Sequence, residues 1–241
     1  MAGKGFRTRN LGEFKPFIEI KKHTILSWFI SSIRKSIKEN DTFVLITSDY
    51  FKQKYNFEEK INEIFNFHKL NNNREFVYTT SFTNGQSVSI LFAKDKISQN
   101  KSIIVINPDQ YIDFDLPIKI KHNTGYIVTY LNYGNQSGYV EIKNGLVKKF
   151  VEKENISNIA SAGVLVLCNG NALVEAIENQ LTRRITTKGE YYLGSSFNYL
   201  INKKFKIFPI PIRSKYDLGS IDGIEAFMKS SISINQNSYI I

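Results

Sequence analysis

Residues 1–17 read MAGKGFRTRNLGEFKPF, a basic segment with three glycines. Gly3 and Gly5 would let backbone N–H groups converge on an anion, and Arg7 could pair with phosphate oxygens. The spacing matches neither a Walker loop nor the G-x-G-x-x-G fingerprint. The segment therefore has two interpretations: a phosphate-binding loop or a flexible charged N-terminus.

A lysine follows this segment directly. Lys15 precedes Pro16 and Phe17, and the next predicted element is a helix that begins near Thr24. A lysine held beside a proline between a phosphate loop and a helix could reach an α-phosphate and offset the charge that develops there. The alternative is an ordinary solvated lysine.

The composition indicates a globular protein with a full core. The chain has 241 residues, of which 42% are hydrophobic and 13% aromatic, and we expect a single domain. Its one cysteine, Cys168, excludes an intramolecular disulfide and fits a reducing compartment. No stretch approaches the roughly 20 apolar residues that span a bilayer, and no signal peptide is apparent. These features predict a cytoplasmic protein without a membrane partner.

The charge is basic, with 32 Lys+Arg against 22 Asp+Glu and a formal net charge of +10. The lysines are scattered along the chain rather than gathered into one basic segment, which favours an anionic small substrate over nucleic acid. A nucleic-acid-binding module remains the alternative from a different class.

Apolar periodicity predicts alternating helices and strands over the first hundred residues. Thr24 is a plausible N-cap of an amphipathic helix over 24–38, and TFVLIT (42–47) has the composition of a strand buried on both faces. This alternation favours a mostly parallel, doubly wound sheet. The other predicted elements here are a helix over 50–66, a strand over 74–80, a helix opened by Gly85 and a strand over 102–107.

The second half contains strands at short spacing. KNG (143–145) is a predicted hairpin turn, and the prolines of FKIFPIPI (205–212) predict an edge strand. No internal repeat or Pro/Gly/Ser-rich linker is present. The remaining predictions are strands over 125–131, 138–142, 146–153 and 161–168, and helices over 171–181, 191–203 and 223–230.

Two aspartates lie where a metal ligand would be useful. Asp109 follows the apolar strand SIIVIN (102–107), and ligands of open α/β sheets bind beyond the carboxyl ends of strands. Asp217, in KYDLGS (215–220), could complete a carboxylate pair around Mg²⁺. Taken singly, Asp109 is more typical of a turn, and Asp217 could equally belong to the start of a helix.

Several motifs occur in an order that resembles the sugar-phosphate nucleotidylyltransferase family: MAGKGFR…KPFIEI, NPDQ, FVEK…SNIASAGV, GEYYLGSSFNYLI and YDLGS…IEAF. The resemblance implies an α/β fold with a Rossmann-like, doubly wound mixed sheet in one domain over 1–241. It would comprise a nucleotide-binding half (1–125), a sugar-phosphate-binding half (126–229) and a tail (230–241).

The resemblance also implies roles for individual residues. Arg7, Lys15, Asp109 and Asp217 would be catalytic, with Asp109 and Asp217 holding Mg²⁺. The nucleotide would be bound by Ala2, Gly3, Gly5, Gly85 and Gln86. The sugar phosphate would be bound by Gly138, Glu152, Lys153 and Glu190, with Lys153 on the phosphate itself.

The implied activity is nucleotidyl transfer from an NTP to a sugar 1-phosphate, giving an NDP-sugar and pyrophosphate for capsule or surface-glycan biosynthesis. The alternative is a catalytically impaired or truncated sugar-nucleotide-binding protein of the same fold, resembling a glycosyltransferase. The base, the sugar and the oligomeric state, including a homo-oligomer, are left open.

The chain departs from the family pattern at three places. Pro108 stands where Ser or Gly is common, and Tyr216 stands where tryptophan is common. Relatives also have an apolar strand of about six residues before the glycine loop. We therefore expect Met1 to be an internal methionine of a longer reading frame, and the upstream DNA would test this.

Overall fold

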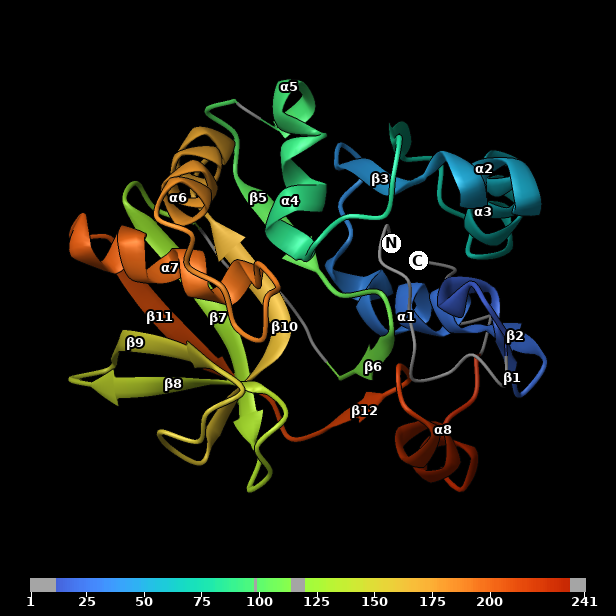
Figure 1. Cartoon of the computed structure of the whole chain (residues 1–241). Coiled ribbons are helices and arrows are strands. Elements are labelled where there is room, and N and C mark those ends of the chain that lie inside the picture. Colours follow the sequence, from blue (N-terminus) through green and yellow to red (C-terminus); the bar gives the residue numbers. More distant parts are fainter. Residues whose placement is uncertain (1–11, 98, 114–119, 235–241) are drawn as a thin grey trace. The chain divides into compact units, whose positions relative to one another are not determined.

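The computed structural model describes residues 12–97, 99–113 and 120–234. The chain divides into two compact units (Figure 1). Unit 1 comprises Met1–Phe82, Pro108–Pro117 and Ser214–Ile241, and unit 2 comprises Thr83–Asn107 and Ile118–Arg213. The predicted division into functional halves at residue 125 stays a prediction.

Unit 2 is built on a six-stranded mixed sheet, which confirms the predicted mixed α/β class. Its order is β11-β7-β10-β8-β9, and β5 also pairs with β10. Only β11 and β7 run parallel within it, and its other strand pairs are antiparallel, as expected for a mixed sheet. The connections set strand direction, and the apolar composition of a strand does not reveal it. The strands are β5 (Ile103–Ile106), β7 (Thr124–Leu131), β8 (Gly138–Lys143), β9 (Leu146–Glu152), β10 (Ile159–Leu167) and β11 (Lys206–Pro211).

Four helices of unit 2 pack together, and the two longest contact this sheet. The helix α6 (Gly170–Thr182) contacts β10, α7 (Leu193–Asn202), α4 (Gln86–Leu91) and α5 (Lys94–Ile97), and α7 contacts β9. Asn169 caps α6, its side chain accepting a hydrogen bond from the Ala172 N–H at 2.7 Å. Because α4 and α7 both lie against α6, segments far apart in the sequence become neighbours.

Turn chemistry in unit 2 follows the sequence. Asn144 (φ 53°) and Gly145 (φ 72°) both adopt the left-handed conformation that a tight hairpin between β8 and β9 requires, which confirms the predicted turn. The strand β11 pairs only with β7 among the described strands, so the prolines do lie on an edge strand.

Unit 1 contains a parallel pair, β3 (Thr42–Ser48) with β4 (Asn73–Thr79), together with the antiparallel pairs β1–β2 and β6–β12. Only Leu45, Thr47 and Ser48 of β3 are buried, so the expectation of a strand buried on both faces is wrong for its first half. The other elements are η2 (Lys15–Phe17), β1 (Glu19–Ile20), β2 (His23–Thr24), α1 (Ile25–Ile33), η3 (Arg34–Ser36), α2 (Asp49–Tyr55), α3 (Phe57–Phe67), β6 (Gln110–Ile112), β12 (Lys215–Asp217) and α8 (Ile221–Met228).

Two predicted helices of unit 1 have different boundaries. Thr24 is the predicted N-cap, accepting from the Ser27 N–H at 3.1 Å, but α1 ends at Ile33 and continues only as the 3₁₀ turn η3. The Ser32 hydroxyl donates to the Phe29 carbonyl at 2.7 Å, a bond that competes with regular helical pairing. The predicted helix over 50–66 is split because Asn56 adopts the left-handed conformation.

The core of unit 1 connects its N-terminal segment to its last helix. The Trp28 side chain is 1% exposed, donates its indole N–H to the Ile20 carbonyl at 2.7 Å, and packs edge-on against Phe227 of α8 at 5.0 Å. Leu218, next to Asp217, belongs to the same cluster and is fully buried. This packing anchors the segment that contains Asp217 and Leu218.

A buried histidine in unit 1 should make stability depend on pH. His68 is fully buried, and its Nε2 lies 2.8 Å from the Ser27 hydroxyl oxygen. Burial, followed by the nearby His23, lowers the pKa of His68 to about 4 from 6.5. The unfolded chain thus binds the proton more readily, and we expect about 3 kcal/mol of stability to be present above pH 6.5 and lost as pH falls toward 4.

Urea unfolding between pH 7.5 and 4.5 would measure this loss. The variant His68→Gln should flatten the dependence over this range, while His122→Gln, which removes an exposed histidine, should retain it. An equal slope in wild type and His68→Gln would contradict the assignment.

Candidate active site

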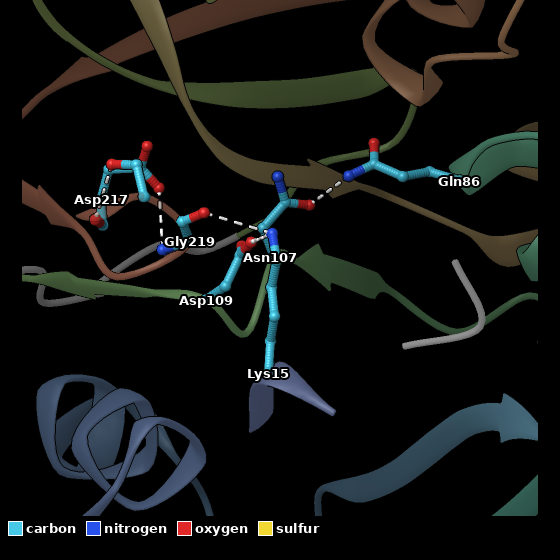
Figure 2. Close-up of polar contacts among 7 residues, drawn as sticks. Lys15, Gln86, Asn107, Asp109, Asp217 and Gly219 are labelled. Atoms are coloured by element: carbon cyan, nitrogen blue, oxygen red, sulfur yellow. Dashed lines mark hydrogen bonds and ion pairs between the residues drawn. The ribbon is translucent and has the colours of Figure 1, made fainter. Parts of the chain in front are cut away.

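The turn that carries Lys15 is anchored by aromatic packing of the neighbouring Phe14. The Lys15 ammonium contacts a carboxylate and a backbone carbonyl. Lys15 opens the 3₁₀ turn η2, next to Phe14, whose ring is 3% exposed and lies 4.4 Å from the Phe51 ring. The Lys15 ammonium is 3.6 Å from Asp109 Oδ2 and donates to the Gly219 carbonyl at 3.3 Å (Figure 2). With a side chain only 16% exposed, Lys15 is not an ordinary solvated lysine.

The strand pair β6–β12 brings the two predicted metal ligands together. Asp217 pairs with Gln110 in this antiparallel ladder, and Asp109 is the residue directly before Gln110. The two aspartates are therefore close neighbours. A short loop after β12 then places Gly219 between the carboxylates: its N–H donates to Asp217 Oδ1 at 3.1 Å (Figure 2). Asp217 does not cap the last helix, because Ser220 is the N-cap of α8.

The lack of a side chain at Gly219 is necessary for this convergence. A Cβ built on Gly219 would lie 2.4 Å from Asp109 Oδ2 and 3.1 Å from Asp217 Oδ1. Both carboxylates and the Lys15 ammonium therefore gather around one backbone position of unit 1. We call Lys15, Asp109, Asp217 and Gly219 the Gly219 cluster.

A buried donor outside the set of predicted site residues lies beside this cluster. Gln110 is 2% exposed, and its side-chain Nε2 has no hydrogen-bond partner in the part of the chain that the structure describes. Paired residues of an antiparallel ladder project to the same face, so the Gln110 side chain is on the face of Asp217. Buried amides are nearly always hydrogen-bonded, which makes Gln110 a candidate donor to a ligand.

The predicted nucleotide-binding residues Gly85 and Gln86 lie in unit 2 at the start of α4. Gly85 has φ 110°, and a Cβ there would lie 2.5 Å from the Tyr191 carbonyl oxygen, so only glycine fits. Gln86 donates its side-chain N–H to Asn107 Oδ1 at 2.6 Å (Figure 2). Asn107 is in turn close to Gly163 (φ 73°), where a Cβ would lie 2.8 Å from Asn107 Nδ2.

Asn107 was not among the predicted site residues. The available signals were its position directly after an apolar strand and a glycine inside the neighbouring strand, which often marks a close approach. Neither signal identifies, from the sequence alone, the residues that Asn107 contacts.

Three of the four predicted sugar-phosphate residues meet at β8 and β9. Gly138 pairs with Glu152, and a Cβ on Gly138 would lie 2.7 Å from Glu152 Oε2 and 2.2 Å from Phe150 Cζ. Lys153 follows Glu152 with a left-handed backbone (φ 57°), and its ammonium contacts the Tyr192 hydroxyl.

Glu190 is the exception among these predicted residues. It is exposed, and its backbone forms a two-residue bridge with Thr187. The remaining predicted residues, Ala2, Gly3, Gly5 and Arg7, lie outside the described residues.

Neither a metal-binding cluster of three or more side chains nor a membrane-spanning helix is found in the described part of the chain. Within residues 12–97, 99–113 and 120–234, no group of three or more His, Cys, Asp or Glu side chains is arranged to hold a metal. The same residues contain no helix with the length and apolar character needed to cross a bilayer. The Gly219 cluster thus offers two protein carboxylates.

Comparisons with known proteins identify the fold. No family model matches the chain, and no curated protein matches it. Among solved structures, the nucleoside-diphosphate-sugar pyrophosphorylase from Vibrio cholerae RC9 is 21% identical with a TM-score of 0.80, covering 95% of this chain and 98% of that one. The UDP-glucose pyrophosphorylase from Acinetobacter baumanii is 15% identical with a TM-score of 0.69, covering 94% and 89%. The inositol-1-phosphate CTP transferase from T. maritima is 13% identical with a TM-score of 0.70, covering 97% and 95%.

These likenesses extend over nearly the whole chain. The chain therefore has the Rossmann-like fold of nucleotidyltransferases and nucleotide-sugar pyrophosphorylases, and the predicted fold is confirmed.

Proposed function

We propose that the chain transfers a nucleotidyl group from an NTP to a sugar 1-phosphate, releasing pyrophosphate. The observation that carries this proposal is the Gly219 cluster, where one ammonium and two carboxylates surround a single glycine. Phosphoryl and nucleotidyl transfer need positioned cations around a phosphate more than they need a covalent nucleophile. A site with this combination of groups suits such chemistry.

The residues of the cluster fit a magnesium ion. Mg²⁺ prefers oxygen ligands and is often bound by one or two carboxylates together with substrate phosphates, which is the donor set that Asp109 and Asp217 provide. We propose that these two carboxylates hold it. When bound, the ion would neutralise phosphate charge and polarise a phosphoryl oxygen.

The chain's own residues would act on the phosphates as follows. A phosphate oxygen of the sugar 1-phosphate attacks the α-phosphorus, a P–O bond forms, and the bond to the pyrophosphate leaving group breaks with its electron pair. Lys15 would stabilise negative charge on the α-phosphate, and the Gln110 amide would donate to a phosphate oxygen. Gly85 and Gln86 would approach the base, while Gly138, Glu152 and Lys153 would bind the sugar phosphate.

The product would be an NDP-sugar. We propose capsule or surface-glycan synthesis in the cytoplasm as its use, on the strength of the motif resemblance alone.

A pyrophosphate-release assay tests the proposal directly. The full chain would be incubated with Mg²⁺ and each combination of ATP, GTP, CTP, UTP or dTTP with a panel of sugar 1-phosphates. We expect release to require both substrates and to be highest for one base and one sugar. No release across the whole matrix from folded protein would refute the proposed function.

A further inference from the structure

A buried glutamine in unit 2 connects two segments that the sequence separates widely. Gln180, in the last turns of α6, is 1% exposed. Its Oε1 accepts from the Ser87 hydroxyl at 2.7 Å, and its Nε2 donates to the Tyr192 carbonyl at 2.9 Å and the Ile185 carbonyl at 3.2 Å. Two carbonyl acceptors on one side and a hydroxyl donor on the other set the orientation of the amide.

The two segments joined by Gln180 also bond through their backbones. Ser87 donates its N–H to the Tyr191 carbonyl at 3.1 Å, and Tyr191 donates to the Asn84 carbonyl at 3.1 Å. The close approach of Gly85 to Tyr191 leaves no room for a side chain between them. The segment 84–87, which contains the predicted nucleotide-binding residues Gly85 and Gln86, and the segment 190–192 are therefore joined by hydrogen bonds.

Tyr192 extends this structure to the predicted phosphate ligand. Its hydroxyl contacts the Lys153 ammonium, which also lies 4.3 Å from the centre of the Tyr192 ring, a cation–π distance. The Lys153 backbone has φ 57°, a conformation that costs energy for a residue other than glycine. The Lys153 N–H donates to the Ser137 carbonyl at 2.8 Å, which holds the backbone but not the side chain.

We propose that Gln180 is a positioning residue that holds Tyr192 against Lys153 and, through Ser87, holds the segment of Gln86. Tyr192 positions the Lys153 ammonium for the phosphate of the sugar 1-phosphate. Neither residue needs to touch the reacting atoms. This inference rests on the proposed function for its kinetic part.

The two residues should have different kinetic signatures. Tyr192→Phe keeps the ring but removes the hydroxyl, so the KM for the sugar 1-phosphate should rise about 10-fold while the KM for the NTP stays unchanged. Gln180→Met keeps the side-chain length but removes all three hydrogen bonds, so both KM values should rise about 10-fold. In each case kcat should change less than KM.

Asn72→Leu is the matched control for losing a buried amide. Asn72 is 5% exposed and donates to the carbonyls of Lys38, Glu39 and Asp41 in unit 1, whereas Gln180, Tyr192 and Lys153 belong to unit 2. It should lower the thermal midpoint as Gln180→Met does and leave both KM values unchanged. Equal KM changes in Gln180→Met and Asn72→Leu would show that Gln180 has a merely structural role and would overturn the proposal.

An NMR measurement tests the positioning without turnover. After reductive ¹³C-methylation of the lysines, the Lys153 signal, identified by its loss in Lys153→Arg, should be displaced by the Tyr192 ring in the wild type. It should move toward the position of solvated lysines in Gln180→Met and remain in place in Asn72→Leu. An unmoved Lys153 signal in folded Gln180→Met would overturn the proposal, whereas absence of turnover in wild type would refute only the proposed function.

Discussion

Replacing Lys15 by alanine should lower kcat on the order of 10³-fold, with a much smaller change in the KM values. The reason is that negative charge grows on the α-phosphate in the transition state. The Lys15 ammonium would therefore stabilise the transition state more than the ground state. Steady-state pyrophosphate release with the preferred substrates would measure the effect. Lys15→Arg should recover part of the rate, because the charge remains but the reach and shape of the cation differ.

The fold should tolerate this change. Lys15 lies in a short turn whose stability comes from buried neighbours such as Phe14, so circular dichroism of Lys15→Ala should match wild type. Lys60→Ala is the control: this exposed lysine of α3 also pairs with a carboxylate, Glu63, at 2.8 Å. A kcat for Lys15→Ala equal to that of Lys60→Ala would remove Lys15 from the proposed mechanism.

Replacing Asp217 by asparagine should also lower kcat on the order of 10³-fold and shift the Mg²⁺ dependence of the rate to higher concentration. Asparagine keeps the shape of the side chain and an oxygen that can accept from the Gly219 N–H, so the loop after β12 should keep its conformation. What the variant loses is one negative charge from the proposed metal site. Rates measured over a Mg²⁺ titration would separate weaker metal binding from a slower step at saturation.

Asp109→Asn and Asp113→Asn complete this test. Asp109→Asn should behave like Asp217→Asn and should also remove the ion pair with Lys15. Asp113 is exposed and close in sequence, and its replacement should leave the Mg²⁺ titration unchanged. If all three variants had the same Mg²⁺ midpoint as wild type, the two carboxylates of the Gly219 cluster would not be metal ligands.

Much of the local structure could be predicted from the sequence. Thr24 as a helix N-cap, the Asn144–Gly145 turn and the proline-bearing edge strand β11 depend on interactions within a few residues. The early end of α1 and the break at Asn56 could not be predicted, since the apolar period continues through both positions. There a side-chain hydrogen bond or a left-handed residue overrides periodicity.

The site was only partly predictable. The sequence pointed to Lys15, Asp109 and Asp217 as separate candidates, each with an ordinary alternative. Their convergence on Gly219 depends on β6 and β12, strands of three residues that have no detectable pattern. Gln180 was hidden for a similar reason: a buried polar residue in an amphipathic helix looks like part of its polar face until its partners are known.

The class of the fold and the kinds of side chain available for the chemistry follow from the amino-acid sequence, because apolar periodicity, turn residues and motif order are properties of the chain. Which of those side chains meet depends on the folded structure. The short antiparallel pair β6–β12 brings Asp109 and Asp217 to Gly219, and packing around α6 joins Ser87, Gln180 and Tyr192. Such contacts join residues far apart in sequence, and their geometry depends on the folded core rather than on local preference.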